Sequence, residues 1–410
     1  MSQKNKILLS VYACEPNRGS EPGVGWNWAI GMTEYFDVWV VTRQNNKQVI
    51  EAYMKEHQIK NIKFLYYDPP SKILLLKKIL GVHLFYTLWQ IGVNSLIKVT
   101  MLKEDIEFFH SLTFGSALLP VSSFGQKKNF IWGPISGCNT IPREYSKHYP
   151  LKGRLVETIR SLTVFSLKFN VKFISRCKKA KLILCKDEAT LKSIPIEYRH
   201  KGIIFTDVAV DMVSEKVKNK TVANLTTFIS IGVLEPWRGF DILIEAFSIA
   251  EKKNANLKLN IIGDGYLKKN LNNLIIKKGL TESITLCGQL SIDDYNKNMA
   301  MCDAVINPCL KEGAVTAAFD SIRYGKPLIC VETGGFTKYF TDEYSYVIPR
   351  TSRQEVIDRI ADAMHKVSVA ENNYELASKL ESLHVKFSWK TKISNFQTSF
   401  ENCFNTTTKN

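Results

Sequence analysis

The chain alternates short runs of β-branched and aromatic residues with longer stretches of helical periodicity along almost its whole length. This alternation is typical of βαβ units, in which helices connect the strands of a parallel sheet. It therefore predicts an α/β protein. The length of 410 residues and the hydrophobic fraction of 45% suffice for two domains, each with a core of its own.

The predicted strands fall into two series, separated by a polar, lysine- and asparagine-rich linker at residues 214–224. The first series is expected at residues 6–11, 38–42, 63–67, 107–110, 129–132, 181–184 and 202–205, and the second at 227–231, 257–262, 283–286, 303–306 and 327–331. Helical patterns follow at residues 353–369, 371–383 and 389–404. We expect two Rossmann-like domains, at residues 1–213 and 214–385, and a C-terminal helix and tail at residues 386–410 that pack back on the N-terminal domain.

The chain is basic, with 55 Lys and Arg residues against 39 Asp and Glu and a net charge of +16. Such an excess attracts phosphorylated ligands, nucleic acid or an acidic membrane surface, without choosing among them. No nucleic-acid recognition module accompanies the charge, so we do not expect a nucleic-acid partner. The nine cysteines are scattered without a Cys-x2-Cys pair, which argues against a zinc module and favours reduced thiols in a cytoplasmic protein.

Two segments bear on a membrane partner. The longest uncharged stretch, residues 79–97, approaches the length of a membrane span, but polar residues interrupt it, and it predicts a long, partly buried helix. Between residues 152 and 181, nine Lys and Arg side chains stand against the single acidic residue Glu157, with apolar residues interleaved. Such a basic amphipathic surface suits an anionic membrane, and a simply solvated helix face is the alternative.

In open parallel sheets, ligands bind beyond the carboxyl ends of the strands, so the loops that follow the strands are the candidate sites. After the first strand, Gly19, Gly23 and Gly25 precede a helix expected to start near Trp26. Such a loop lets backbone N–H groups approach an anion, and an ordinary tight turn is the alternative. The complete Gly-x-Gly-x-x-Gly pattern is missing, which disfavours a nucleotide-dependent oxidoreductase.

His110 stands at the end of the fourth predicted strand. A neutral imidazole in that position could hydrogen-bond a phosphate or a sugar hydroxyl, and a histidine satisfied within the fold is the alternative. The loop at residues 132–137 follows the next strand and has glycines that permit close approach of a ligand, although its role could be structural.

The second domain places charged side chains after its strands. Arg238 follows the first of them, where a guanidinium can hold a diphosphate in a forked geometry or else lie solvated on the surface. Glu312 lies on the loop after the strand at 303–306, and Asp320 lies on the helix that residues 313–316 open. Two carboxylates suit the hydroxyls of a sugar and a ribose, and exposed N–H groups suit a phosphate, whereas helix capping is the alternative.

Taken together and in order, these segments resemble the retaining family 4 glycosyltransferases of the GT-B fold, over nearly the whole chain. GVLEPWRGFDILIEAF is similar to the phosphate-clamp segment of that family, IIGDGYLKKNL to its Gly-Asp-Gly segment, and EGAVTAAFDSIRYGKPLI to its Glu-x7-Glu motif. CEPNRGSEPGVGWNWA and FFHSLTFGSALLP…IWGPISG resemble a bacterial subset that acts in surface polysaccharide assembly.

The resemblance implies that the donor is a nucleotide-diphosphate sugar, held mainly by the second domain, and that no cofactor is needed. In the implied site Glu312 contacts the donor sugar, Asp320 contacts the ribose hydroxyls, and Leu290 contacts the base. The diphosphate is bound by Arg238 beside Gly232, and the phosphate or sugar is bound by Gly313, Ala314, Val315 and Thr316. In the first domain His110 matches the active-site histidine, and Gly23, Val24 and Gly25 close on the phosphates.

Two residues depart from the family pattern. The phosphate-binding arginine of the family falls on the uncharged Val233, and the second glutamate of the motif is the shorter Asp320. Loss of one cation from a diphosphate clamp costs on the order of 2 kcal/mol of transition-state stabilisation, unless another basic residue compensates. A catalytically impaired sugar-nucleotide-binding or scaffolding protein is therefore the alternative to an active enzyme.

The implied reaction builds negative charge on the departing phosphate and positive charge at the anomeric carbon. Fixed cations and amides stabilise the first charge, and same-face attack of the acceptor retains the anomeric configuration. The chain contains no Asp-x-Asp, so no metal is expected at the site. The resemblance further implies a glycan acceptor, lipid-linked, in capsule or lipopolysaccharide synthesis, and a cytoplasmic protein at the inner face of the plasma membrane.

Overall fold

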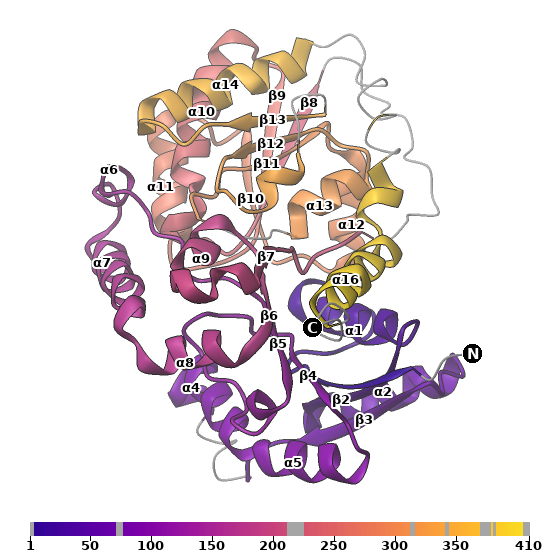
Figure 1. Ribbon diagram of the computed structural model, residues 1–410. Coiled ribbons are helices and arrows are strands. Elements are labelled where there is room, and N and C mark those ends of the chain that lie inside the picture. The colour runs from indigo at the N-terminus through magenta and orange to yellow at the C-terminus, as the bar shows by residue number, and fades with distance from the viewer. Residues whose placement is uncertain are drawn as a thin grey trace. The chain divides into compact units, whose positions relative to one another are not determined.

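The computed structural model describes residues 4–70, 77–210, 225–311, 316–340, 344–369, 379 and 383–404. The chain forms two compact units, each assembled from separate segments (Figure 1). The first unit comprises Met1–Cys138, Phe165–Ala209 and Trp389–Asn410, and the second comprises Asn139–Val164 and Val210–Ser388. Residues 139–164, which the sequence analysis assigns to the N-terminal domain, thus lie in the second unit.

The first unit contains a seven-stranded sheet in the order β3-β2-β1-β4-β5-β6-β7, and every paired strand in it is parallel. Its strands are β1 (Asn5–Ser10), β2 (Phe36–Arg43), β3 (Ile62–Tyr67), β4 (Phe108–Ser111), β5 (Asn129–Ile135), β6 (Ala180–Cys185) and β7 (Gly202–Ile204). Because all these strands are parallel, their carboxyl ends lie at one edge of the sheet. This is the predicted Rossmann-like arrangement, and it is confirmed.

Helices cover this sheet: α1 (Ser20–Met32), α2 (Lys47–Glu56), α4 (Lys77–Gly92), α5 (Asn94–Lys103), α8 (Val171–Lys179), α9 (Glu188–Ser193) and α16 (Trp389–Phe404). The single long helix predicted at residues 79–97 is wrong, because the segment forms α4 and α5. Gly81 inside α4 has a φ of 71°. Gly92 ends α4 at a point where a Cβ atom would meet the Tyr67 hydroxyl at 1.9 Å, and α5 begins at Asn94.

The predicted C-terminal helix is confirmed as α16, and it packs against α1 within the first unit. Phe396 contacts Trp28 and stacks on the ring of His110, and Phe400 contacts Phe36 and Phe108. The last helix of the chain therefore completes the core of the unit that begins with the first strand.

The second unit contains a six-stranded parallel sheet in the order β10-β9-β8-β11-β12-β13. Its strands are β8 (Thr226–Ile231), β9 (Leu257–Ile262), β10 (Ile284–Gly288), β11 (Ala304–Asn307), β12 (Leu328–Val331) and β13 (Ser345–Ile348). The sequence analysis predicts the first five of these and misses β13. That strand has only four residues, of which two are partly exposed, so it lacks a marked apolar run.

The helices of the second unit are α6 (Arg143–Ser146), α7 (Leu151–Ser166, whose last residues belong to the first unit), α10 (Phe240–Lys253), α11 (Lys268–Lys278), α12 (Ile292–Met301), α13 (Thr316–Arg323) and α14 (Arg353–Val369). The helix predicted at residues 353–369 is confirmed. The one predicted at 371–383 and the linker at 214–224 fall largely or wholly outside the described residues. In Figure 1, α10 and α14 lie together on one side of the second sheet, and their apolar faces form its core.

Candidate active site

Three loops of the second unit meet at the carboxyl edge of its sheet. Gly263, after β9, has a φ of 137° and passes so close to the loop after β8 that a Cβ atom would meet the Gly232 carbonyl oxygen at 1.9 Å. The Gly263 amide donates to the carbonyl of Gly288 at the end of β10, at 2.8 Å. Glycine is required at Gly263 by both its conformation and this close approach. Backbone thus lines this edge at close range, although the Gly232 and Gly263 amides already donate to carbonyls of neighbouring strands.

Arg238 lies at this edge on the short 3-10 helix η5 (Pro236–Arg238). Its guanidinium lies over the Trp237 ring, 4.3 Å from the centroid, and beside Gly232, where a Cβ atom would meet Arg238 Nε at 3.4 Å. The structure therefore brings the predicted residues Arg238 and Gly232 together. Val233, next to them, has 52% of its surface exposed and no charge.

Asp320 lies on α13, which begins at the half-buried Thr316. The hydroxyl of Tyr295, on α12, donates a hydrogen bond to Asp320 Oδ2 at 2.6 Å. Burial raises the pKa of the Tyr295 hydroxyl, and the adjacent carboxylate raises it further. Leu290, half-buried, lies just before α12. Glu312, Gly313, Ala314 and Val315 lie outside the described residues.

A buried ion pair that the sequence analysis misses lies beside this group. Lys311 lies in the loop that follows β11 and pairs with Glu157 of α7. The two side chains are only 8% and 6% exposed. Lys311 Nζ lies 5.4 Å from the centroid of the Trp237 ring, which Arg238 also contacts. Burial lowers the pKa of Lys311, and Arg160 lowers it further, while Glu157 opposes both. No sequence pattern joins two residues so far apart in the chain.

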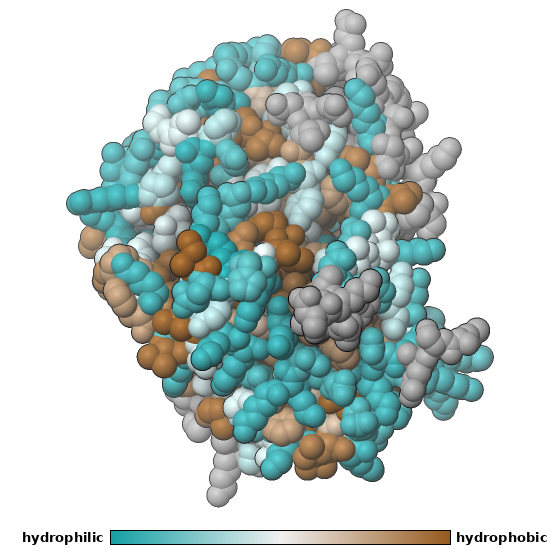
Figure 2. Space-filling model, viewed as in Figure 1, coloured by the Kyte–Doolittle hydropathy of each residue, from teal (hydrophilic) through white to brown (hydrophobic). Residues whose placement is uncertain are grey.

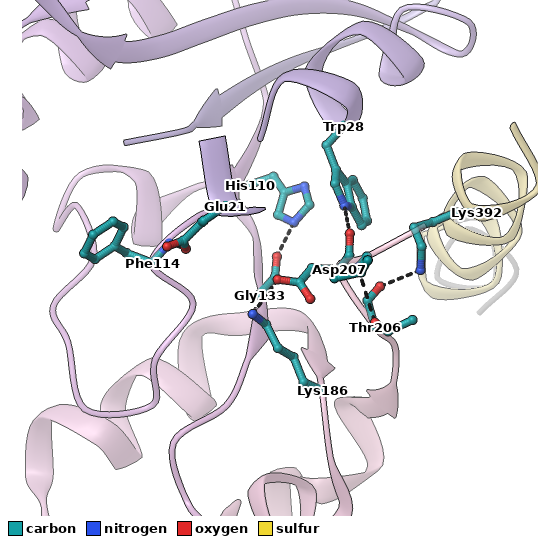
Figure 3. Close-up of polar contacts among 10 residues, drawn as sticks. Glu21, Trp28, His110, Phe114, Gly133, Lys186, Thr206, Asp207 and Lys392 are labelled. Atoms are coloured by element: carbon teal, nitrogen blue, oxygen red, sulfur yellow. Dashed lines mark hydrogen bonds and ion pairs between the residues drawn. The ribbon is translucent and has the colours of Figure 1, made fainter. Parts of the chain in front are cut away.

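His110 lies at the end of β4 in the first unit, with no exposed surface. Its Nε2 lies 2.6 Å from the Gly133 carbonyl oxygen, so the neutral ring donates its proton there (Figure 3). The ring stacks on Phe396 and meets Trp28 edge-on. Burial lowers its pKa to about 4, although the bond to Gly133 opposes the shift. One ring nitrogen is thus bonded within the fold, whereas Nδ1 is buried without a hydrogen-bond partner, and the role of His110 in catalysis stays a prediction.

The glycines after β1 lie elsewhere than expected. The helix predicted to start near Trp26 instead starts at Ser20, so Gly23, Val24 and Gly25 are buried inside α1. A Cβ atom on Gly23 would meet the Arg18 carbonyl oxygen at 1.9 Å. The predicted loop is wrong, because these glycines serve the close packing of α1 on the segment before it. Their contact with a donor phosphate stays a prediction.

The first unit has further polar side chains at its carboxyl edge, which the sequence analysis misses (Figure 3). Glu21 Oε1 accepts a hydrogen bond from the Phe114 amide at 2.5 Å, and burial raises the pKa of its carboxyl. Lys186, directly after β6, forms an ion pair with Asp207, which follows β7. A polar residue at the end of a strand was the signal used for His110, and the same signal would have found Lys186, which directly follows β6.

Helix α7 exposes an apolar stripe. Leu151, Leu155, Ile159, Leu162 and Phe165 recur at intervals of three and four residues and are 55% to 81% exposed. Side chains at this spacing share one face of a helix. Exposed lysines and arginines flank them, and Figure 2 shows brown side chains among teal ones on the flank where Figure 1 places α7. Glu157 and Gly153 lie on the opposite, buried face.

Among the described residues, no helix is long and apolar enough to cross a membrane. Within the same residues, no group of three or more His, Cys, Asp or Glu side chains is placed to hold a metal ion.

Comparison with known proteins identifies the second unit. Residues 213–379 match the model of the family "Glycosyl transferases group 1". The chain therefore contains a glycosyl transferases group 1 domain, which holds Gly232, Arg238, Leu290 and Asp320.

Several curated relatives match the chain, including the following two. It is 26% identical over 176 residues to an uncharacterized glycosyltransferase of Methanocaldococcus jannaschii, covering 42% of this chain and 46% of that protein. It is 22% identical over 191 residues to the lipopolysaccharide 1,2-N-acetylglucosaminetransferase of Salmonella typhimurium, covering 44% of this chain and 49% of that protein. The chain spans about half the length of the curated relatives it matches.

The whole chain is similar to solved structures. With the Anabaena protein HepE in complex with UDP and glucose, the TM-score is 0.59 at 15% identity, covering 97% of this chain and 100% of that one. At this identity the likeness concerns the fold, and the two parallel sheets with their helices correspond to the two Rossmann-like domains of the GT-B fold.

Proposed function

We propose that the protein is a retaining glycosyltransferase that moves a sugar from a nucleotide-diphosphate sugar to a lipid-linked glycan in bacterial surface polysaccharide synthesis. One observation carries the proposal: Arg238 lies beside the glycine-lined loops at the carboxyl edge of a sheet that belongs to a glycosyl transferases group 1 domain. Backbone amides and a guanidinium at that edge suit a diphosphate. The relative of Salmonella typhimurium, by its name, acts on lipopolysaccharide.

In the proposed reaction, Arg238 stabilises the charge that develops on the leaving diphosphate. Asp320, oriented by Tyr295, accepts from the ribose hydroxyls. Glu312 contacts the donor sugar, and the acceptor attacks on the face that the diphosphate leaves. No Asp-x-Asp occurs in the chain, so we propose that this chemistry proceeds without a metal ion.

The first experiment is a thermal-shift comparison of UDP, GDP, ADP, CMP and NAD at equal concentrations, because a ligand that binds the native state raises its stability. One nucleoside diphosphate standing out names the donor class. Transfer from the matching sugar nucleotide is then measured for wild type and Glu312→Ala, with product anomers assigned by NMR and with EDTA added in parallel. An inverted product, or full activity of the variant, contradicts the corresponding part of the proposal.

The alternative is a protein that binds the nucleotide sugar without turnover, which the exposed, uncharged Val233 favours. Lys311 does not replace the missing cation, because it is buried and paired with Glu157. Nucleotide binding without transfer to any acceptor, the lipid-linked one included, would establish the alternative.

The α7 stripe supports peripheral binding at the inner face of the plasma membrane. Its five apolar side chains can enter the interface while flanking cations such as Lys152 and Arg154 meet anionic headgroups, each contributing about 1 kcal/mol. Vesicle flotation with 30% phosphatidylglycerol should recover the wild type but not Leu155→Ser/Ile159→Ser. Pure phosphatidylcholine vesicles are the control, and equal recovery of both proteins from anionic vesicles contradicts the assignment.

A further inference from the structure

Glu157 lies on the buried face of α7, opposite the exposed apolar stripe. Its carboxylate pairs with Lys311, which follows it by 154 residues in the chain and directly precedes Glu312. A buried ion pair adds little net stability, because both charges lose their hydration. The pair does restrict the relative position of Glu157 and Lys311, since the two charged groups must stay together once they are buried.

The backbone that leads to Lys311 is held on both sides. The Leu310 amide donates to the Trp237 carbonyl at 3.0 Å, and Arg350 donates to the Leu310 carbonyl at 2.6 Å. The partners in these two hydrogen bonds, Trp237 and Arg350, lie in loops that follow strands of the second sheet. Glu157 is the contact that α7 adds, and it acts on the Lys311 side chain.

The same contact reaches Arg238. Lys311 lies over the Trp237 ring at 5.4 Å from its centroid, and Arg238 lies against that ring at 4.3 Å. A change in the position of Lys311 therefore alters the packing of the residue that supports Arg238. Both loops proposed to bind the donor, after β8 and after β11, are thus tied to one carboxylate.

Helix α7 is itself held close to these loops. A Cβ atom on Gly153, one turn before Glu157, would lie 3.0 Å from Pro236 Cγ and 3.2 Å from the Tyr266 hydroxyl. Lys152 lies over the Tyr266 ring at 5.4 Å. The helix therefore contacts the loops after β8 and β9 before it presents Glu157 to the loop after β11.

We propose that Glu157 is a positioning residue for the donor site, acting through Lys311 and the Trp237 ring on Arg238. The proposal rests on the proposed function. In this role Glu157 acts on the position of the Arg238 guanidinium and does not itself react. Its loss lowers kcat and leaves the KM for the acceptor unchanged.

The test compares Glu157→Gln, Lys311→Met and the double variant Glu157→Gln/Lys311→Met. The double variant leaves no unpaired buried charge, so it separates positioning from simple loss of stability. Initial rates of transfer and calorimetric affinities for the nucleoside diphosphate selected by thermal shift are measured for each, with thermal unfolding to check the fold. Glu188→Gln, which breaks the exposed pair with Lys192, is the matched control.

We expect kcat at least tenfold below wild type in both Glu157→Gln and the folded double variant, with the control unchanged. A double variant that regains the wild-type rate and affinity overturns the proposal, because the pair then only neutralises charge. An unaffected Glu157→Gln overturns it as well. A wild type that binds nucleotide but transfers no sugar overturns the proposed function, and lower affinity in both Glu157 variants then still supports positioning.

Discussion

The hydroxyl of Tyr295 donates a hydrogen bond to Asp320 Oδ2 at 2.6 Å, which joins α12 to α13 at the carboxylate expected to bind ribose. The contact fixes the shorter side chain that stands in place of a glutamate. Removal of the hydroxyl leaves the carboxylate without this orientation.

Tyr295→Phe should therefore weaken the nucleotide affinity about three- to tenfold, as expected for loss of roughly 1 kcal/mol. Calorimetric titration measures the change. Tyr324→Phe is the matched control, because its hydroxyl donates to Asn296 at 2.8 Å, not to Asp320. Equal weakening in both variants would show that the Asp320 contact has no special role.

Val233→Arg should raise the transfer rate. The side chain is 52% exposed, so an arginine fits without disturbing the core, and it returns a cation to the edge that holds Arg238. A gain of about 2 kcal/mol in transition-state stabilisation corresponds to roughly thirtyfold in kcat. Val233→Gln controls for size without charge. A faster glutamine variant, or an unchanged arginine variant, would show that no diphosphate charge develops near this position.

His110 should make the first unit sensitive to acid. Its pKa is about 4 in the folded protein, below the usual 6.5, because burial disfavours the charged ring. Between these values the unfolded chain binds a proton that the folded one does not, so stability falls as the pH drops from about 6.5 to 4. The loss should approach 3 kcal/mol, on the basis of 1.4 kcal/mol per pH unit.

Urea unfolding at several pH values in this range, compared between wild type and His110→Gln, measures this loss. The difference between the two proteins isolates His110 from the carboxylates that also titrate in acid. Parallel pH profiles for wild type and variant would contradict the assignment.

Lys392 should act at the other end of the pH range. This half-buried lysine of α16 donates to the Thr206 carbonyl at 2.7 Å, and the partial loss of solvent around its ammonium lowers its pKa to about 7, although Asp207 opposes the shift. Between pH 7 and 10.5 the unfolded chain holds a proton that the folded chain has lost, so stability rises with pH by about 1.4 kcal/mol per unit. Lys392→Met should lack this rise in urea unfolding between pH 7.5 and 9.5.

Lys390→Met, at an exposed position of the same helix, is the control and should keep the rise. If wild type and both variants share one slope, the ammonium of Lys392 stays charged in the folded state.

The sequence predicts most of the fold because strand and helix periodicity are local properties. The strand at 257–262 and the helices at 353–369 and 389–404 have the predicted bounds. β13 escapes prediction because it is short and half-exposed. The start of α1 is predicted too late because glycine intrinsically disfavours helices, and the glycines near residue 23 therefore predict a loop. In the structure these glycines lie inside α1, where close packing leaves no room for a Cβ atom.

Within the site, Arg238 is predictable because it follows a strand and lies in a recognisable segment. Glu157 is not, since its partner Lys311 is distant in the chain and only the folded structure joins them. Tyr295 escapes for the same reason, because the hydrogen bond to Asp320 connects two helices. The residues expected to bind the donor can thus be predicted from their local position in the sequence. The residues that orient them cannot, because their role depends on tertiary contacts.

The discontinuous make-up of the two units constrains the order in which the chain can fold. The core of the first unit includes Phe396 and Phe400, which pack on Trp28, Phe36 and Phe108. During synthesis, Trp28 and its neighbours leave the ribosome long before α16 is made. The aromatic cluster around Trp28, Phe36 and Phe108 therefore stays incomplete during synthesis until α16 has been translated.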